Sequence, residues 1–363
     1  MKNIAVFFGG NSIEHEISVI TGVLTVNSID KRYNAVPIYV AKDGSFYTGN
    51  ILKDPDCYKN LDYKKLTKVT LISGKNVLYA IKGKKLKELF AITTAINCTH
   101  GERGEDGCVS ALVNTCNIAL ASPDILGSSV CMNKSFTKTV LKGLNLSSLP
   151  SETVSDVVSA RKAERFKYPL IVKPCTGGSS IGISKVNDKR ELEIAVLYAL
   201  SYSEKAIIEP CLAGFTEINC ACFKDSDGNL VVSECERPIG RDEVLTFSDK
   251  YNYGEREFPA RIDKNLSDEI KNATKLIYKE LGFKGVIRVD FFVKDNKVIV
   301  NEINTVPGSL AYYLFCENTA KFKDMLNEMI AYAETVFNRS QMIKKSYDTK
   351  ILSTLRPKGS KTI

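Results

Sequence analysis

The stretch IRVDFFVKDNKVIVNEIN, residues 287–304, decides how the rest of this sequence is interpreted. Two runs rich in Val, Ile and Phe flank the polar residues around Asn296, a pattern typical of a β-hairpin, which we expect over 286–303. With the loop centred near Asn296, polar side chains on the two strands should meet on one face, because side chains alternate along a strand. The predicted facing pairs are Arg288 with Asn304 and Asp290 with Glu302.

The chemistry of these four groups suits a divalent cation and a phosphate. Oxygen ligands without histidine are typical of Mg²⁺, and the guanidinium of Arg288 could hold a transferring phosphate or stabilise a developing oxyanion. In the alternative, Asp290 and Glu302 form cross-strand ion pairs with Arg288 on a solvated face, which would be worth little energy. The next segment favours the first interpretation, because Gly308 after Pro307 leaves a backbone N–H beside the metal for use as an oxyanion donor.

A second candidate site is the glycine- and serine-rich loop KPCTGGSSIG, residues 173–182, which lies between two predicted strands. Its backbone N–H groups and hydroxyls can donate to phosphate oxygens, and Lys173 adds a positive charge. The loop is not a Walker loop, because no Gly-Lys-Ser/Thr run precedes a helix. A plain hairpin loop is the alternative.

The end of the first predicted strand offers a third candidate site, in the segment GGNSIEHEIS over residues 9–18. Ligands bind at the carboxyl ends of parallel strands in open α/β sheets, so Glu14 could hold a substrate ammonium. In the alternative, Ser12 caps the following helix, while Glu14 and Glu16 complement its dipole. His100 lies in the similar segment THGERGEDG, where we expect it to support the site through hydrogen bonds.

The pattern of strands and helices predicts an α/β protein with an α+β arrangement in its C-terminal half. The first unit has strands expected at 4–8, 35–40, 69–73, 77–81 and 95–98 and a helix at 16–29, which favours a parallel sheet covered by helices. The second unit begins after Pro150, with strands at 170–172, 182–186 and 206–209 and a helix at 188–201. The last unit has strands at 216–223 and 229–235, the hairpin, and helices at 265–281, 311–317 and 321–337.

The length of 363 residues exceeds what one hydrophobic core usually serves, so we expect several lobes. The predicted divisions are an N-terminal substrate-binding lobe over 1–130, a central lobe over 131–212, a C-terminal lobe with the metal site over 213–340, and a basic tail over 341–363.

The composition argues against several classes of protein. No apolar run approaches the roughly 20 residues that cross a bilayer, and the eleven cysteines lack paired CxxC spacing. We therefore expect a cytoplasmic protein with reduced thiols and no membrane contact. The net charge of +8 is spread along the chain instead of being interleaved with aromatics, which disfavours nucleic acid as a partner and suits an anionic small molecule.

Together, these motifs resemble the D-alanine–D-alanine ligase family of ATP-grasp enzymes in their order and spacing from Gly9 to Gly308. The resemblance implies a three-lobed ATP-grasp fold with a parallel-sheet lobe at its N-terminus. It implies ATP and two Mg²⁺ ions as cofactors, with Mn²⁺ as a substitute, and a homodimer that makes a peptidoglycan precursor in the cytoplasm. In the implied reaction, ATP phosphorylates the carboxylate of a first D-amino acid, and the amine of a second attacks the acyl phosphate.

The resemblance also implies roles for individual residues. The groups expected at the first substrate and the reacting atoms are Glu14, Ser179, Tyr251, Arg288 and Gly308. The groups expected at ATP are Lys134, Lys173, Ser180, Glu209, Glu217 and Lys250. The expected magnesium ligands are Asp290, Glu302 and Asn304. Further substrate contacts are expected from His100, Glu105, Ser309, Tyr313 and Leu314.

The second-substrate side of the predicted site departs from the family pattern, because Tyr313 stands where the family has a serine that meets the second substrate's carboxylate. D-Alanine is the expected acceptor, while D-serine or another amino acid remains open. A catalytically impaired nucleotide-binding relative is a further alternative. The Lys250-Tyr251 pair resembles the dipeptide-forming enzymes and not the ligases that use D-lactate.

Overall fold

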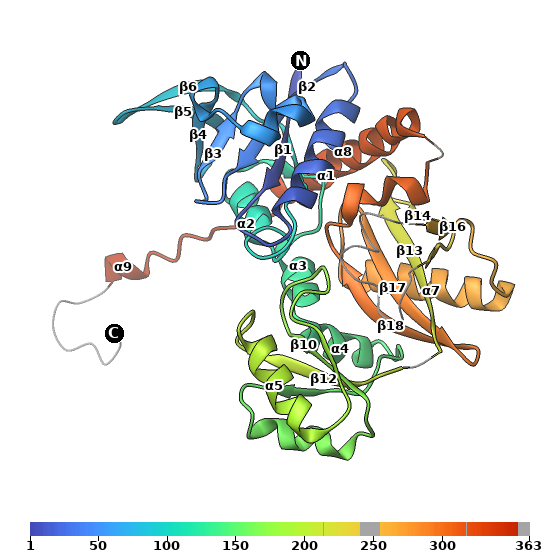
Figure 1. Ribbon diagram of the computed structural model, residues 1–363. Coiled ribbons are helices and arrows are strands. Elements are labelled where there is room, and N and C mark those ends of the chain that lie inside the picture. Colours follow the sequence, from blue (N-terminus) through green and yellow to red (C-terminus); the bar gives the residue numbers. More distant parts are fainter. Residues whose placement is uncertain (213, 240–254, 317, 355–363) are drawn as a thin grey trace.

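The structure, a computed structural model, describes residues 1–212, 214–239, 255–316 and 318–354. Within these residues it contains one eight-stranded sheet, two four-stranded sheets and one two-stranded sheet (Figure 1). The three larger sheets follow one another along the chain, and helices lie between and against them. The predicted α/β class with three lobes is confirmed. The exact lobe boundaries stay a prediction.

The N-terminal sheet has the strand order β6-β5-β4-β3-β2-β1-β7-β8 and combines two kinds of pairing. Its parallel half contains β1 (Lys2–Gly9), β2 (Tyr33–Val40), β7 (Thr94–Asn97) and β8 (Ala119–Leu120). Its antiparallel half contains β3 (Phe46–Thr48), β4 (Thr67–Ile72), β5 (Lys75–Lys82) and β6 (Lys85–Ala91). The predicted parallel sheet is therefore right for the half around β1 only. The turns that join β4, β5 and β6 are too short for the crossover that a parallel pair needs.

Helices from both ends of the chain cover this sheet. Helix α1 (His15–Ser28) packs on β1 and also contacts α8 (Thr319–Gln341), which lies beside β7 and β8 (Figure 1). Phe322, Leu326 and Ile330 of α8 share a hydrophobic core with Phe8 of β1. The predicted helix at 321–337 thus exists, but it completes the N-terminal lobe as well as contacting β13 of the third sheet. Helix α2 (Cys108–Thr115) follows β7.

The second sheet is antiparallel with the order β11-β10-β12-β9. Its strands are β9 (Glu152–Val154), β10 (Leu170–Pro174), β11 (Ser184–Val186) and β12 (Ala206–Pro210). Helix α5 (Lys189–Leu200) covers it, because Leu192 and Val196 form a buried face against Leu170 and Ile208. Helices α3 (Ile125–Met132) and α4 (Lys134–Gly143) connect this lobe to the rest of the molecule.

The third sheet has the order β14-β13-β17-β18 and carries the predicted hairpin. Its strands are β13 (Thr216–Lys224), β14 (Leu230–Val232), β17 (Ile287–Lys294) and β18 (Lys297–Asn304), and α7 (Lys264–Glu280) packs against them. The facing pairs predicted from the sequence are confirmed, since Arg288 lies opposite Asn304 and Asp290 opposite Glu302. Strands β15 (Arg237–Ile239) and β16 (Glu255–Glu257) form the two-stranded sheet beside it.

The segment after β18 does not form the predicted helix over 311–317. It is a short 3₁₀ segment, η5 (Gly308–Leu314), in which Ser309, Leu310 and Ala311 all have φ near 50°. Non-glycine residues adopt this left-handed conformation only when their surroundings impose it. Here Leu310 and Ala311 are buried in the core beside α1, and the backbone N–H of Ser309 donates to Thr21 Oγ1 at 3.0 Å. Tertiary packing therefore decides the shape of this turn.

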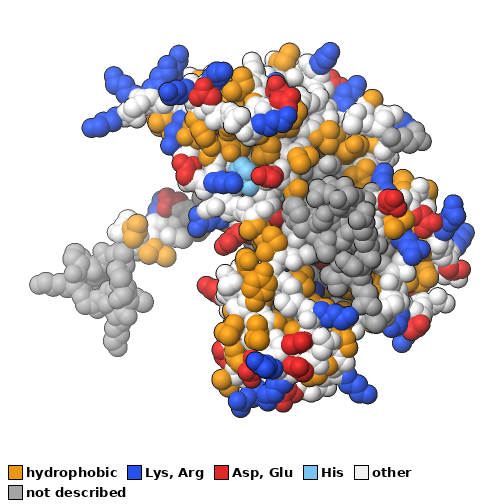
Figure 2. All heavy atoms as spheres, in the orientation of Figure 1, with side chains coloured by type: hydrophobic (Ala, Val, Ile, Leu, Met, Phe, Trp, Pro, Cys, Tyr) orange, Lys and Arg blue, Asp and Glu red, His pale blue; other side chains and the backbone are white. Residues whose placement is uncertain are grey.

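The remaining elements are short. They are η1 (Asn50–Lys53), η2 (Pro55–Asn60), η3 (Tyr63–Lys65), η4 (Ser159–Arg165) and α9 (Ile351–Thr354). Among the described helices, none combines the length and the apolar composition that a membrane span requires. On the face in Figure 2, basic and acidic side chains are interspersed, and a group of exposed lysines occupies the β5–β6 turn, namely Lys82, Lys84, Lys85 and Lys87.

Candidate active site

The three lobes meet around a cavity of about 420 Å³. The loops after β1 and β7 contribute one wall, the glycine-rich loop between β10 and β11 a second, and the third sheet with η5 a third. A smaller cavity of about 110 Å³ adjoins it and shares Gly177, Gly178, Ser179, Glu217 and Glu302 as lining residues. The glycine-rich loop, which the sequence also allowed to be a plain hairpin loop, thus lies between both cavities.

The hairpin brings its four polar groups together in a largely buried position. Arg288 donates from Nε and Nη2 to both carboxylate oxygens of Asp290 at 2.7 and 2.8 Å. Asn304 Nδ2 donates to Asp290 Oδ2 at 3.0 Å. The side chain of Asp290 is only 2 % exposed, and that of Arg288 is 16 % exposed. The alternative of cross-strand ion pairs on a solvated face is therefore wrong, because this ion pair joins two residues of one strand, β17, and is largely buried.

The smaller cavity contains a buried cluster of opposite charges around Glu209 of β12. Lys173 Nζ lies 2.7 Å and Lys138 Nζ 2.6 Å from the two oxygens of this carboxylate. Burial by itself would raise the pKa of Glu209, but the two lysines outweigh it and lower the pKa below its ordinary value. Lys138 was not among the predicted site residues. Its spacing of four from Lys134 on α4 is the signal that could have indicated it.

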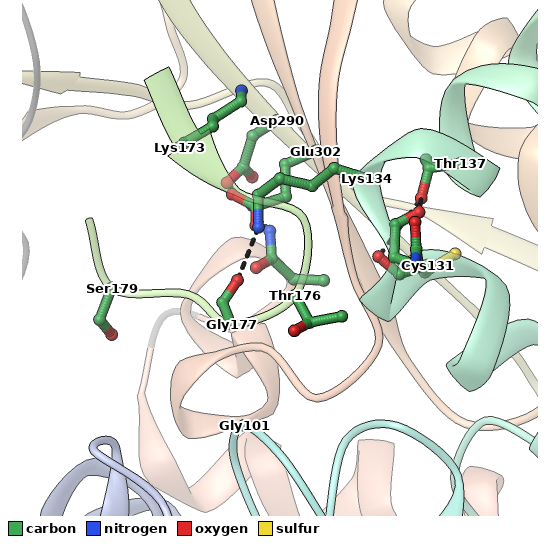
Figure 3. A network of polar contacts seen from close by, with 12 residues as sticks. Gly101, Cys131, Lys134, Thr137, Lys173, Thr176, Gly177, Ser179, Asp290 and Glu302 are labelled. Carbon is green, nitrogen blue, oxygen red and sulfur yellow. Dashed lines mark hydrogen bonds and ion pairs between the residues drawn. The ribbon is translucent and has the colours of Figure 1, made fainter. Parts of the chain in front are cut away.

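Lys134, at the start of α4, joins the glycine-rich loop to the hairpin (Figure 3). Its ammonium donates to the carbonyl of Gly177 at 2.6 Å and lies 3.9 Å from Glu302 Oε1. Ser179 and Ser180 of the loop both have positive φ, as does Gly177. This backbone shape turns the loop over the cavity, where Ser180 and Ser179 line the smaller one.

On the opposite wall, Ser179 Oγ donates a hydrogen bond to Glu14 Oε1 and so links the central lobe to the N-terminal lobe. Space here is tight, because a Cβ added at Gly178 would lie 3.1 Å from Glu14 Oε2. Ser12 accepts from the Glu14 N–H at 3.2 Å and donates to the His100 carbonyl, but α1 begins later, at His15, without a side-chain cap.

Two further N-terminal residues have strongly shifted pKa values. Burial, together with the negative charge of Glu14, raises the pKa of Glu105 to about 8. Its oxygens accept from the backbone N–H groups of Gly101 and Val306, both at 3.3 Å. Burial, followed by the nearby charge of Arg288, lowers the pKa of His100 to about 4, so that this imidazole is neutral at pH 7. The expected supporting position of His100 agrees with its contact to Thr21 Oγ1 at 3.1 Å.

The structure brings most of the predicted residues together and leaves a few apart. The predicted residues that line one or both cavities are Glu14, His100, Glu105, Lys134, Lys173, Ser179, Ser180, Glu209, Glu217, Arg288, Glu302, Asn304, Gly308, Ser309 and Tyr313. Asp290 lines neither cavity but is hydrogen-bonded to Arg288 and Asn304, which line the larger one. Leu314 is 2 % exposed and packs in the core with α1 and α8, so its prediction as a substrate contact is wrong. Lys250 and Tyr251 lie outside the described residues.

The lining residues that the sequence analysis missed include a polar group in the third lobe. This group consists of Asn219 of β13, Glu236, which pairs with it, and Arg256 of β16. Asn219 lies on a predicted strand and Glu236 directly follows another, but nothing in their spacing indicates a site.

The hairpin residues fit a hard divalent cation by their chemistry. Asp290, Glu302 and Asn304 supply carboxylate and amide oxygens, which Mg²⁺ prefers. Asp290 already accepts from Arg288 and Asn304, but a carboxylate has about four acceptor positions, so it can still face a cation. No cluster of three or more His, Cys, Asp or Glu side chains suited to a metal occurs within the described residues. Magnesium would therefore depend on this mixed set and on ligands from phosphate and water.

Comparison with known proteins identifies the family. The model for the D-ala D-ala ligase N-terminus matches residues 3–123, and the model for its C-terminus matches residues 123–331. The D-alanine–D-alanine ligase of Thermosipho melanesiensis is 35 % identical, with 97 % of this chain and 98 % of the relative covered. The D-alanine-D-alanine ligase from Coxiella burnetii has a TM-score of 0.79 at 26 % identity, covering 94 % of this chain and 96 % of that one.

A second similar structure is that of a ligase named for a different acceptor, D-serine. The VanG D-Ala:D-Ser ligase from Enterococcus faecalis has a TM-score of 0.77 at 26 % identity, covering 92 % of this chain and 99 % of that one. The two family models together cover most of the sequence, and their shared boundary at residue 123 lies just after β8. This chain belongs to the D-alanine–D-alanine ligase family.

Proposed function

We propose that the protein joins two D-alanine molecules at the expense of ATP, through an acyl phosphate of the first. Its family consists of ligases that form a C–N bond with ATP, and its relatives bear the name D-alanine–D-alanine ligase. The observation that carries the proposal is the convergence on one cavity of Glu14 from the first lobe, Ser179 from the second and Arg288 from the third. Each lobe thus supplies a group of the kind that the reaction needs.

The phosphate-binding side is supported by the smaller cavity and its cations. Lys173 is the first residue of the glycine-rich loop, and Lys134 lies between that loop and Glu302 of β18. Both line the smaller cavity, where they can neutralise phosphate oxygens. Ser180 and the loop's backbone N–H groups add donors. Apolar side chains line the remainder of this cavity and suit a purine ring, namely Ile171, Ile183, Leu212, Phe215 and Phe292. Glu209 and Glu217, which also line this cavity, would accept hydrogen bonds from the nucleotide.

The reacting side is supported by the groups around the larger cavity. Glu14 offers a carboxylate to the ammonium of the first D-amino acid, and Ser179, bonded to Glu14, holds that carboxylate in place. Arg288 and the backbone N–H of Gly308 would stabilise the negative charge that develops when the second amine attacks. Such positioning and charge neutralisation are the main requirements of phosphoryl transfer.

The cation that we propose is Mg²⁺, held by Asp290, Glu302 and Asn304, with two ions as the expected number and Mn²⁺ as a substitute. When bound, it would supply neutralising charge for the phosphates. The residues of this chain would then hold the phosphates against the hairpin, exclude water through the glycine-rich loop and orient the two amino acids.

Tyr313 provides a specific reason to keep D-serine as a second candidate acceptor. This residue lines the cavity and stands at the sequence position where the family has a serine. One structural neighbour is named as a D-Ala:D-Ser ligase. We also propose that the protein acts as a homodimer in the cytoplasm, in keeping with the implication of its family.

The test is a product analysis with purified protein, ATP and Mg²⁺. With D-alanine alone we expect phosphate release that depends on the amino acid. With a mixture of D-alanine, D-serine and D-lactate, mass spectrometry of the products identifies the acceptor that the enzyme prefers. Tight ATP binding without phosphate release from any D-amino acid pair would indicate a nucleotide-binding relative without turnover and would refute the proposal.

A further inference from the structure

The acceptor D-amino acid brings a carboxylate into a cavity that is already acidic. The carboxylates that line it are Glu14, Glu105, Glu217, Glu236, Glu255 and Glu302. An anion enters such a site only where a cation compensates it. Within the described residues, two cations line this cavity, Arg288 and Arg256.

Arg288 has little capacity left for a second carboxylate. Its Nε and Nη2 atoms form the two-pronged contact to Asp290, at 2.7 and 2.8 Å. Its Nη1 donates to the hydroxyl of Tyr313 at 3.3 Å. The side of the guanidinium that best matches a carboxylate is therefore used inside the protein.

Arg256 shows the opposite pattern. All its hydrogen bonds within the described residues start from Nη1, which donates to Glu236 Oε1 at 3.1 Å and to the Tyr313 carbonyl at 3.4 Å. Its Nε and Nη2 atoms have no partner among those residues. These two atoms form the planar fork that binds a carboxylate with two parallel hydrogen bonds. The side chain is 39 % exposed and Arg256 lines the cavity.

The surroundings hold Arg256 in this position. Its guanidinium carbon lies 4.9 Å from the centre of the Tyr313 ring and 5.3 Å from that of Phe258. Glu236 is only 5 % exposed on its side chain and is itself fixed, because its Oε2 accepts from Asn219 Nδ2 at 3.2 Å. Two backbone hydrogen bonds, of 2.8 and 2.9 Å, join the same two residues. The arginine is therefore preorganised before any ligand binds.

Asn219 adds a second polar group on the same wall. Its Oδ1 atom is buried and has no hydrogen-bond partner within the described residues. The amide cannot be turned round without placing its oxygen against the Glu236 carboxylate, so Oδ1 points away from that residue. The amide group of Asn219 therefore orients Glu236, which in turn holds Arg256.

From these contacts we infer that Arg256 binds the α-carboxylate of the acceptor D-amino acid through its Nε/Nη2 fork, with Tyr313 and Glu236 positioning the guanidinium. The inference rests on the proposed function. It assigns to Arg256 the contact with the second substrate's carboxylate that, in the family, is made by the serine at the position of Tyr313.

The test compares acceptors with and without the carboxylate charge. The enzyme is given ATP, Mg²⁺, D-alanine and D-alaninamide together, and mass spectrometry gives the ratio of dipeptide to dipeptide amide. We expect Arg256→Gln to lower this ratio about 10- to 100-fold, since a charged two-pronged contact is lost. Arg256→Lys, which keeps the charge without the fork, should lower it less. A ratio in Arg256→Gln equal to that of the unmodified enzyme overturns the inference.

Two controls separate this result from other failures. Arg261→Gln removes an arginine from the same segment whose side chain is 92 % exposed, and its ratio should not change. Trapping of the acyl phosphate with hydroxylamine needs no acceptor carboxylate, so Arg256→Gln should still form D-alanine hydroxamate at the normal rate. Loss of the hydroxamate in both Arg256 variants would show a structural role and overturn the inference. Absence of dipeptide and hydroxamate with the unmodified enzyme would instead refute the proposed function.

Discussion

Replacement of Glu105 by Gln should make the protein relatively more stable as the pH rises. In the folded protein, burial and the charge of Glu14 raise the pKa of this carboxyl from 4.5 to about 8. The folded state therefore holds the proton more tightly than the unfolded state. Its contribution to stability is fully present below pH 4.5 and is lost progressively as the pH rises to about 8. The amide of the Glu105→Gln variant does not titrate, so this loss would disappear.

The magnitude follows from the linkage between proton binding and folding. A shift from 4.5 to about 8 corresponds to a loss of about 3 kcal/mol in the free energy of unfolding between pH 5.5 and pH 8.5. Glu105 is only partly buried, so water screens part of this effect, and we expect about 1 to 2 kcal/mol. A constant penalty also applies, because a Gln amide cannot accept from both Gly101 and Val306 as the carboxylate does. That penalty is the same at both pH values and cancels.

The assay is unfolding by urea at pH 5.5 and 8.5, followed by tyrosine fluorescence, since the chain has 16 tyrosines and no tryptophan. The quantity of interest is the stability of Glu105→Gln minus that of the unmodified protein, which should increase with pH. Glu14→Gln should give part of the same increase, because it removes the second cause of the shift. A stability difference for Glu105→Gln that stays constant between the two pH values would refute the reasoning.

Three other predictions concern the metal, the packing of the first lobe and the acceptor. Glu302→Gln should reduce phosphate release by at least about 100-fold with an unchanged circular dichroism spectrum, and near-normal rates would contradict the proposed metal role. Gly22→Ala should cost about 1 to 3 kcal/mol of stability, because the new Cβ would overlap the side chain of Phe8. As the control, Gly143→Ala places its Cβ more than 4 Å from any neighbouring atom and should be neutral or stabilising. Equal effects of the two substitutions in urea unfolding would disprove this. Tyr313→Ser should change the ratio of D-alanine to D-serine incorporated while ATP affinity stays similar, and an unchanged product ratio would count against a role of Tyr313 in the pocket.

The hairpin is the part of the site that the sequence predicted best, and the reason is its local periodicity. Side-chain alternation fixes which residues share a face, so a turn near Asn296 is enough to bring Asp290 and Glu302 together. The actual turn pairs Lys294 with Lys297, which would misalign the distant pairs by one residue. A bulge that leaves Asn301 as an extra residue restores them. The predicted pairs were correct because two small errors in the assumed geometry cancelled.

Features that depend on distant contacts could not be predicted in this way. The left-handed turn at Ser309–Ala311 consists of residues that prefer other conformations, and it forms because α1 buries Leu310 and Ala311. Leu314 was assigned to the substrate from its place after Gly308, but the same turn directs it into the core. Helix α8 was placed correctly along the chain, yet its apolar face alone could not indicate that its partner is the N-terminal sheet.

The roles of the two arginines follow from what each already binds, and Tyr313 links them. A serine at this position could not reach the guanidinium of Arg288 while supporting a second arginine with an aromatic face. The tyrosine does both, because its hydroxyl accepts from Arg288 Nη1 and its ring lies under Arg256. Because the Tyr313 oxygen accepts from Arg288, its O–H can still donate one hydrogen bond, whereas the Arg256 fork offers two donors and a positive charge. Among the described residues that line the cavity, Arg256 is therefore the better match in charge and shape for the acceptor's carboxylate that we propose it binds.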